Sequence, residues 1–129
     1  MCERPISVDK PAETASVVED QQWMPVCGLS RLISQNIVCV RVTGIDAILI
    51  WSEGRVVACE RICPHEQADL SRGHLARGRL FCPRHAASFD LRNGRMSYGW
   101  PGRSLRLFPV RIRDDQVWMD ANAIKAQVN

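Results

Sequence analysis

Several features that mark other protein classes are missing from this sequence of 129 residues. No apolar run approaches the roughly 18 residues that a membrane-spanning helix needs. The polar N-terminus, which contains Glu3, Asp9 and Lys10, does not have the pattern of a secretory signal. We therefore expect a cytoplasmic protein with no membrane partner. In a reducing compartment the six cysteines serve as thiols or metal ligands rather than as a disulfide framework.

Aromatic residues are also scarce, and this bears on nucleic-acid binding. They make up 6% of the chain, which leaves few rings to stack on bases. Residues 61–113 hold eleven arginines against three acidic residues, but these arginines are scattered and follow no single periodic face. We expect no nucleic-acid partner. The basic region is either ordinary solvated surface or a face that docks another protein.

Short apolar runs with the alternation of β-strands are abundant. Hydrophobic residues make up 46% and charged residues 24% of the chain, which is the profile of a single globular domain. Strands are predicted over residues 37–42, 47–51 and 55–59, with turns at 43–46 and 52–54 between them. Three short strands at this spacing favour an antiparallel meander.

Strand patterns return near the other end of the sequence. Runs at 105–108 and 110–113 are separated by Pro109, which suits a sheet edge or a bulge because proline cannot donate a ladder hydrogen bond. A turn at 114–116 then leads to a strand at 117–119. Together these runs predict an all-β fold.

The strand-rich halves enclose a long middle segment and are flanked by weakly patterned ends. Residues 1–20 are predicted to form a flexible N-terminal arm, 21–120 the folded domain and 121–129 a C-terminal tail, with a weak helical pattern over 120–127. Between the halves, residues 61–103 are predicted to be irregular. A loop-rich segment of about forty residues is unusual in a compact domain unless something holds it together.

Two matched pairs of metal-binding residues lie in this middle segment. The first is Cys63-Pro64-His65 and the second is Cys82-Pro83-Arg84-His85, so a C-x-H motif is followed after sixteen residues by C-x-x-H. Each pair follows a β-like stretch and offers one thiolate and one imidazole, ligands that suit iron and zinc. The remaining cysteines lack ligand spacing, and all but an exposed Cys2 are expected to be core thiols: Cys27, Cys39 and Cys59.

A structural zinc site is one interpretation of this pattern. Zinc fingers, however, pair like with like, as C-x₂₋₄-C and H-x₃₋₅-H, whereas each pair here is mixed. If the two loops come together side by side, the two cysteines fall on one side and the two histidines on the other. That arrangement gives two sulfurs to one metal and two nitrogens to a second, as an asymmetric [2Fe–2S] cluster requires.

The C-x-H…C-x-x-H pattern resembles the signature of the Rieske iron–sulfur family, and the strand pattern from about residue 22 to 120 resembles a whole Rieske domain. The resemblance implies stacked antiparallel sheets that carry two cluster-binding loops. It also implies a proline-containing cover loop that shields the cluster from water, at the position of Gly99-Trp100-Pro101-Gly102.

The same resemblance implies a [2Fe–2S] cofactor and assigns its ligands. Cys63 and Cys82 correspond to the residues that hold the buried iron, and His65 and His85 to those that hold the outer iron. Because imidazole replaces two thiolates, such clusters are reduced at roughly −150 to +300 mV, well above all-cysteine clusters. The histidine edges would be the exit port for the electron.

Four further positions place the reduction potential toward the low end of that range. Respiratory Rieske proteins carry a disulfide between their loops. By the resemblance, the corresponding positions here are Ala68 and Arg84, which cannot form one. Those proteins also donate serine and tyrosine hydroxyls to the cluster, at positions that are Ala87 and Phe89 here. Hydrogen bonds to sulfur raise the reduction potential. Because this chain lacks those hydroxyl donors, it resembles the low-potential ferredoxins that supply electrons to oxygenases.

Histidine is too scarce for this chain to be an oxygenase itself. Of three histidines the cluster would use two, and His74 alone cannot build a 2-His-1-carboxylate iron site. No G-x-G nucleotide fingerprint is present either. We therefore expect a non-enzymatic electron-transfer component of a multicomponent oxygenase system.

The resemblance implies two partners for this one-electron carrier, a flavin-dependent reductase and a terminal oxygenase. Both would dock at the tip of the cluster loops, where Arg84, with Arg72 or Arg103, would steer toward carboxylates. Two alternatives stay open: the cluster-bearing small subunit of another reductase system, such as a nitrite-reductase-like one, and a structural zinc module.

Overall fold

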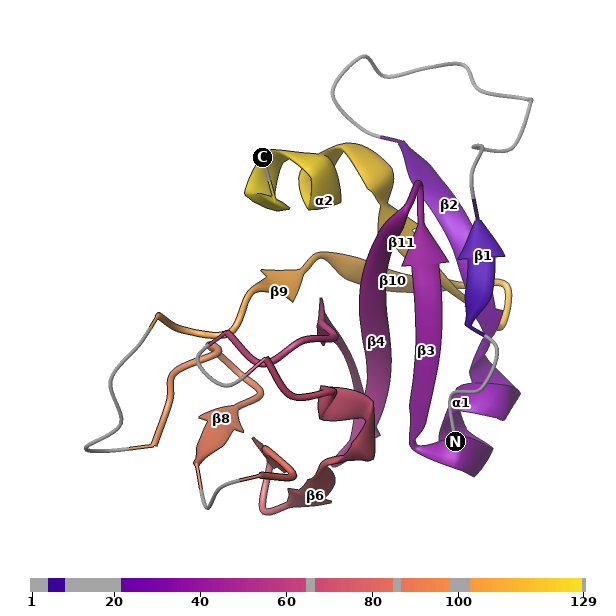
Figure 1. Ribbon diagram of the computed structural model, residues 1–129. Coiled ribbons are helices and arrows are strands. Elements are labelled where there is room, and N and C mark those ends of the chain that lie inside the picture. The colour runs from indigo at the N-terminus through magenta and orange to yellow at the C-terminus, as the bar shows by residue number, and fades with distance from the viewer. Residues whose placement is uncertain (1–4, 9–21, 65–66, 85–86, 98–102, 129) are drawn as a thin grey trace.

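The structure is a computed structural model that describes residues 5–8, 22–64, 67–84, 87–97 and 103–128. These residues form mostly strands, arranged in one five-stranded and two three-stranded sheets (Figure 1). The predicted all-β class is therefore confirmed. Among the described residues no helix is long and apolar enough to span a membrane.

The largest sheet contains the predicted meander. Its strand order is β1-β3-β4-β5-β9, and every neighbouring pair is antiparallel except β1 with β3. The strands are β1 (Ile6–Val8), β3 (Ile37–Val42), β4 (Ile45–Ser52), β5 (Arg55–Glu60) and β9 (Leu107–Phe108). β1 lies within the segment predicted to be an arm, because three residues are too few for alternation to be visible in the sequence.

The second sheet joins the two ends of the folded region. Its order is β10-β11-β2, all antiparallel, with β2 (Trp23–Gly28), β10 (Val110–Arg113) and β11 (Gln116–Asp120). Two helices flank these strands, α1 (Leu29–Gln35) and α2 (Ala121–Val128). The weak pattern near the C-terminus is thus a helix. α1 was not predicted, since it is short and Leu32 is its one buried residue.

The first apolar core lies between these two sheets. Alternate residues of the central strands point into it, including Val38, Val40 and Val42 of β3 and Leu49 of β4. They pack against β2, β11 and α2, whose contributions are Met24, Val26, Val117, Met119 and Ile124. The three β3 valines therefore share one face of the strand, as the two-residue period of a β-strand requires.

A second core covers the opposite face of the central sheet. The intervening residues Ile48 and Ile50 of β4 and Val57 of β5 pack there against Leu80 and Phe89. The central strands are therefore buried on both faces, which explains why β4 reads as a continuous apolar run rather than an alternating one. Figure 1 shows the β6 and β8 region on one side of β3 and β4, with β2 and α1 on the other.

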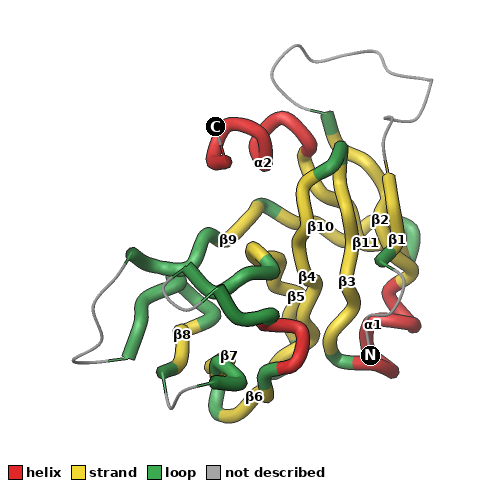
Figure 2. Tube along the Cα trace, in the orientation of Figure 1, coloured by secondary structure: helices red, strands yellow, loops and turns green. Residues whose placement is uncertain are grey.

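The middle segment is more regular than predicted. It contains a 3₁₀ turn, η1 (Leu70–Arg72), and a third sheet of order β6-β7-β8, with β6 (His74–Ala76), β7 (Arg79–Phe81) and β8 (Ser88–Asp90). The expectation of an irregular segment was wrong because these strands are only three residues long. Figure 2 shows them as short strands between long loops.

Two local features confirm predictions from turn chemistry. Pro109 lies between β9 and β10, which are edge strands of different sheets, so it interrupts no ladder. The β4–β5 turn has positive φ at both Glu53 (+52°) and Gly54 (+74°). Two successive left-handed residues form the tight hairpin turn whose twist matches the strands.

Candidate metal centre

The two cysteines of the motif lie in the same apolar layer. Cys63 follows β5 and is 0% exposed, and Cys82 follows β7 and is 3% exposed. Both belong to the second core, and neither forms a disulfide. Two buried thiols on neighbouring loops are soft ligands for a metal shielded from water.

The first loop is closed by backbone hydrogen bonds around Cys63. The Cys63 N–H donates to the Ala68 carbonyl at 2.8 Å, and the Gln67 N–H donates to the Cys63 carbonyl at 3.0 Å. At the base of the loop the Leu70 N–H donates to the Arg61 carbonyl at 2.7 Å. The backbone of Cys63 is therefore fixed from both sides.

The second loop is closed in the same way. The Cys82 N–H donates to the Ala87 carbonyl at 3.0 Å, again the residue five positions after the cysteine. Below this bond the chain pairs as the β7–β8 hairpin, with Phe81 opposite Ser88. The alanine in this position is buried in both loops, Ala68 at 3% and Ala87 at 0% exposure. Sequence reasoning did not use this shared spacing, although it is visible in the sequence.

The two histidines of the motif, His65 and His85, lie outside the described residues, as does the proposed cover loop at 99–102. The structure therefore places the cysteine half of the predicted site. Of the other residues singled out, Arg84 and Arg72 are exposed. His74 is also exposed and stacks on Phe81, with ring centroids 4.7 Å apart.

A bidentate ion pair braces the first loop. The Arg61 guanidinium donates to both carboxylate oxygens of Asp69, at 3.0 and 2.8 Å. The same carboxylate accepts from the Ser71 N–H at 3.0 Å and from its hydroxyl at 2.7 Å. The hydrogen bonds from Arg61, with those from Ser71, lower the pKa of Asp69 to about 2. Asp69 is therefore ionised at neutral pH and locks the loop.

Hydrogen bonds that involve no carboxylate brace the second loop instead. The Ser88 hydroxyl accepts from the Arg79 Nε–H at 2.7 Å. The Ser88 N–H donates to the Ser97 hydroxyl at 3.1 Å, and the Ser97 N–H donates to the Ser88 carbonyl at 2.8 Å. No carboxylate takes part in these contacts.

A close backbone approach supports the segment that leads to the proposed cover loop. Gly94 has φ +77°, and a Cβ atom there would lie 2.2 Å from the Leu105 carbonyl oxygen. The Leu105 N–H donates to the Gly94 carbonyl at 2.8 Å. Only glycine allows both the left-handed conformation and this contact.

The cluster environment contains no hydroxyl at the two positions compared with respiratory proteins. Ala87 and Phe89 are both 0% exposed and offer no side-chain donor. Burial raises the pKa of the Cys27 and Cys59 thiols, which fits inert core residues. Cys39 is buried but disulfide-bonded, so the expectation of a core thiol was wrong there.

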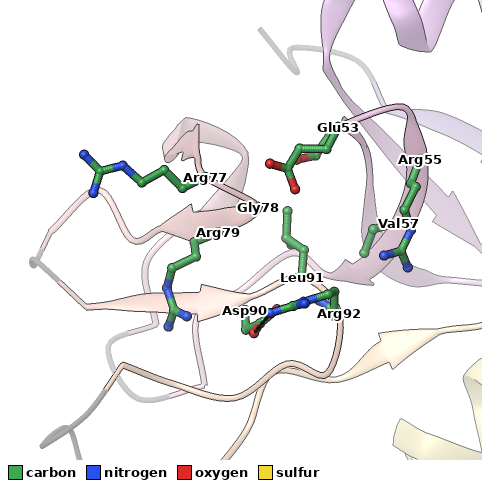
Figure 3. A pocket seen from close by; sticks show the side chains of 10 residues that line it. Glu53, Arg55, Val57, Arg77, Gly78, Arg79, Asp90, Leu91 and Arg92 are labelled. Atoms are coloured by element: carbon green, nitrogen blue, oxygen red, sulfur yellow. Dashed lines mark hydrogen bonds and ion pairs between the residues drawn. The ribbon is translucent and has the colours of Figure 1, made fainter.

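A surface pocket of about 260 Å³ lies away from the cysteines. It is formed by the β4–β5 turn, the β6–β7 turn and the end of β8 (Figure 3). These are the ends of β5 and β7 remote from Cys63 and Cys82. The Glu53 carboxylate extends toward Gly78, while Arg77 points away from it. The pocket is therefore distinct from the candidate metal centre.

Comparison with known proteins decides the family. The profile of the Rieske [2Fe-2S] domain matches residues 22–109, a span that contains both loops. The chain belongs to the Rieske [2Fe–2S] family. The predicted resemblance is confirmed, and the cofactor of this Rieske protein is a [2Fe–2S] cluster.

Individual relatives agree with this family. The ferredoxin component of the naphthalene 1,2-dioxygenase system of Pseudomonas putida is 27% identical over 99 residues, covering 77% of this chain and 95% of the relative. The anthranilate 1,2-dioxygenase ferredoxin subunit of Burkholderia cepacia is 29% identical over 97 residues, covering 74% and 89%. The chain thus matches these relatives over nearly their whole length.

A solved structure shares the fold. A chain in the complex of reduced oxygenase and oxidized ferredoxin in carbazole 1,9a-dioxygenase superposes with a TM-score of 0.70 at 24% identity, over 78% of this Rieske protein and 94% of that chain. The predicted architecture of stacked antiparallel sheets is confirmed.

The described residues fit a [2Fe–2S] cluster. Two thiols that are not oxidised lie in one apolar layer, each on a loop closed by the same cysteine-to-alanine hydrogen bond. Thiolate ligation requires deprotonated sulfur next to iron, and exclusion of water from Cys63 and Cys82 protects such bonds. Zinc fingers with paired cysteines in one knuckle have no counterpart in these loops.

Proposed function

We propose that this Rieske protein is a one-electron carrier whose [2Fe–2S] cluster is held by Cys63 and Cys82 on one iron and by His65 and His85 on the other. When bound, the cluster accepts one electron and returns it without transfer of atoms. The observation that carries the proposal is the matched closure of two loops, each burying one thiol.

The protein residues have three tasks in this exchange. The hydrogen bonds from the Cys63 and Cys82 N–H groups to Ala68 and Ala87 hold the cysteine backbones in place. The apolar layer keeps water from the sulfurs. Because the backbone around Cys63 is held from both sides, little reorganisation is needed when the electron arrives.

We assign its partners to a multicomponent oxygenase system. Relatives that match over nearly their full length are ferredoxin components of dioxygenase systems, so the electron would come from a flavin-dependent reductase and pass to a terminal oxygenase. The chain carries the electron and does not catalyse oxygenation, since His74 stacks on Phe81 and is the one histidine outside the proposed ligand set.

The three arginines considered for steering differ in their exposure and ion pairing. Arg84 and Arg72 are exposed and have no ion-pair partner within the described part of the chain. The Arg103 guanidinium, in contrast, forms an ion pair with Glu60. We therefore assign steering toward an acidic partner surface to Arg84 and Arg72, which flank the proposed ligand loops.

We place this exchange in the cytoplasm. Cell fractionation followed by immunodetection tests the location, and recovery with the periplasm would contradict it.

The decisive experiment is a redox titration of anaerobically purified protein followed by electron paramagnetic resonance. A cluster with mixed sulfur and nitrogen ligation is coloured, becomes paramagnetic on uptake of one electron, and titrates toward the lower part of the Rieske range, because Ala87 and Phe89 offer no hydroxyl. Colourless protein that contains zinc and no iron would contradict the proposal.

A further inference from the structure

An ion pair between distant segments lies close to the first cluster loop. Glu60 is the last residue of β5, three positions before Cys63, and Arg103 follows the segment assigned to the cover loop. The Arg103 guanidinium donates two hydrogen bonds to the Glu60 carboxylate, each 2.7 Å long. It donates a third to the Ser104 carbonyl at 3.0 Å. Bidentate pairing of this kind fixes the position of the charge.

The carboxylate is the anchored member of the pair. Glu60 Oε2 also accepts from the Arg106 N–H at 2.7 Å, and the Glu60 N–H donates to the Arg106 carbonyl at 3.1 Å. The Glu60 side chain is 13% exposed, against 43% for Arg103. Glu60 is thus held by the sheet, and it in turn holds the guanidinium in place.

Arg103 differs from the other arginine that braces this loop. The pKa of Arg103 is raised by its hydrogen bond to Glu60, and its further electrostatic partners include Cys63. The pKa of Arg61 is raised by Asp69, and no cysteine is among its partners. Both arginines form bidentate pairs at the same loop, and of the two it is Arg103 whose electrostatic partners include Cys63.

We propose that Arg103, positioned by Glu60, is a tuning residue whose positive charge raises the reduction potential of the cluster. Uptake of one electron from the reductase makes the cluster more negative. A cation held by Glu60, three positions before Cys63, favours that reduced form. Arg103 supplies by charge part of the stabilisation that respiratory proteins obtain from hydroxyl donors. The inference rests on the ligand set proposed above.

The test breaks the same ion pair from its two sides. The midpoint potentials of Arg103→Gln and Glu60→Gln are measured by protein-film voltammetry, with cluster content checked by visible absorption. Arg103→Gln is expected to lie below wild type because a cation is lost. Glu60→Gln is expected at or above wild type because an anion is lost while the cation stays.

A purely structural clamp predicts another result. Either substitution would then loosen the same contact, so both potentials would move in the same direction. Glu60→Gln falling below wild type together with Arg103→Gln would overturn the tuning role. The matched control is Arg92→Gln, which removes a cation from a pair whose arginine is 76% exposed and is expected to leave the potential unchanged. Equal shifts in Arg103→Gln and Arg92→Gln would also overturn the proposal.

If Arg103→Gln fails to hold the cluster, a further variant, Arg103→Lys, still tests the proposal. Arg103→Lys keeps the charge and loses the planar bidentate geometry, so its potential is expected to stay close to that of wild type. If Arg103→Lys and Glu60→Gln both fall below wild type, the charge is not the cause and the inference is wrong. Absence of the cluster signal in wild-type protein, in contrast, would overturn the proposed function itself.

Discussion

The two cluster loops have the same backbone closure but different side-chain supports. In both, the cysteine N–H bonds the carbonyl of a buried alanine, Ala68 or Ala87. The first loop is braced by the ion pairs of Asp69 and Glu60, and the second by the Ser88 hydroxyl. The difference teaches that one type of loop closure can be supported with or without a carboxylate, with different responses to pH.

The largest expected effect tests what the loops share. Replacing either Cys63 or Cys82 by alanine removes one of two sulfurs proposed for the same iron, so each variant should lose the cluster completely. Iron content and visible absorption measure this loss. Cys59→Ala is the matched control, since Cys59 is a buried cysteine in the same core and should keep its iron. Retention of the full cluster by either ligand variant would contradict the assignment.

The next effect tests the segment that supports the second loop. In Gly94→Ala the new Cβ would lie 2.2 Å from the Leu105 carbonyl oxygen, at a φ of +77°. We expect the free energy of unfolding to fall by about 2 to 4 kcal/mol, because backbone must shift. Gly44→Ala is the control: its φ is +84° and nothing lies within 4 Å of the new atom. That change should cost about 1 kcal/mol, and equal losses would show that the contact is unimportant.

A smaller effect distinguishes the carboxylate support of the first loop from the hydroxyl support of the second. The pKa of Asp69 falls from 3.8 to about 2 on folding, so its ionised form stabilises the fold above pH 4 and this contribution disappears as the pH falls toward 2. Asp69→Asn should cost about 1 to 2 kcal/mol at pH 7. The melting-temperature difference from wild type should shrink below pH 4.

Ser88→Ala provides the matched variant on the second loop. Its hydroxyl accepts from Arg79, and no carboxylate takes part in this contact. A loss of about 1 kcal/mol should therefore be the same between pH 3 and 7. Parallel pH profiles for the Asp69 and Ser88 variants would remove the distinction between the two loops.

The smallest effect concerns docking. Arg84→Glu reverses an exposed charge on the second loop and should slow reduction by the physiological reductase severalfold at low salt while leaving the cluster in place. Stopped-flow kinetics at increasing ionic strength measure this, and the difference should vanish at high salt. Arg31→Glu, on exposed helix α1, is the control. Unchanged kinetics in Arg84→Glu would rule out steering by this residue.

Much of the fold was predictable because its longer strands and its turns depend on residues that are neighbours in the sequence. The alternation over residues 37–42 and the turn at Glu53 and Gly54 follow from sequence neighbours. Of the third sheet, the β-like stretch before Cys82 was predicted and is β7. β6 and β8 were not predicted, because each is three residues long and depends on the loops it supports. Propensity carries little information over so short a window.

The same distinction applies to the site. The cysteine and histidine spacing predicted the ligand set, since thiolate and imidazole in two matched pairs suit iron and zinc. The pairing of Glu60 with Arg103 spans 43 positions and leaves no periodic signal. Sequence analysis therefore considered Arg103 for steering and did not predict its ion pair. Which charge is free and which is neutralised is a property of the folded chain.

The pairing of β2 with β11 has a consequence for biogenesis. The Gln22 N–H donates to the Asp120 carboxylate across 98 positions, so β2 finds its partner only after nearly a hundred further residues have left the ribosome. Until then one apolar face of the nascent meander stays exposed to water. Safe maturation of this protein therefore depends on how quickly the late strands arrive, and chaperone demand should be highest in that interval.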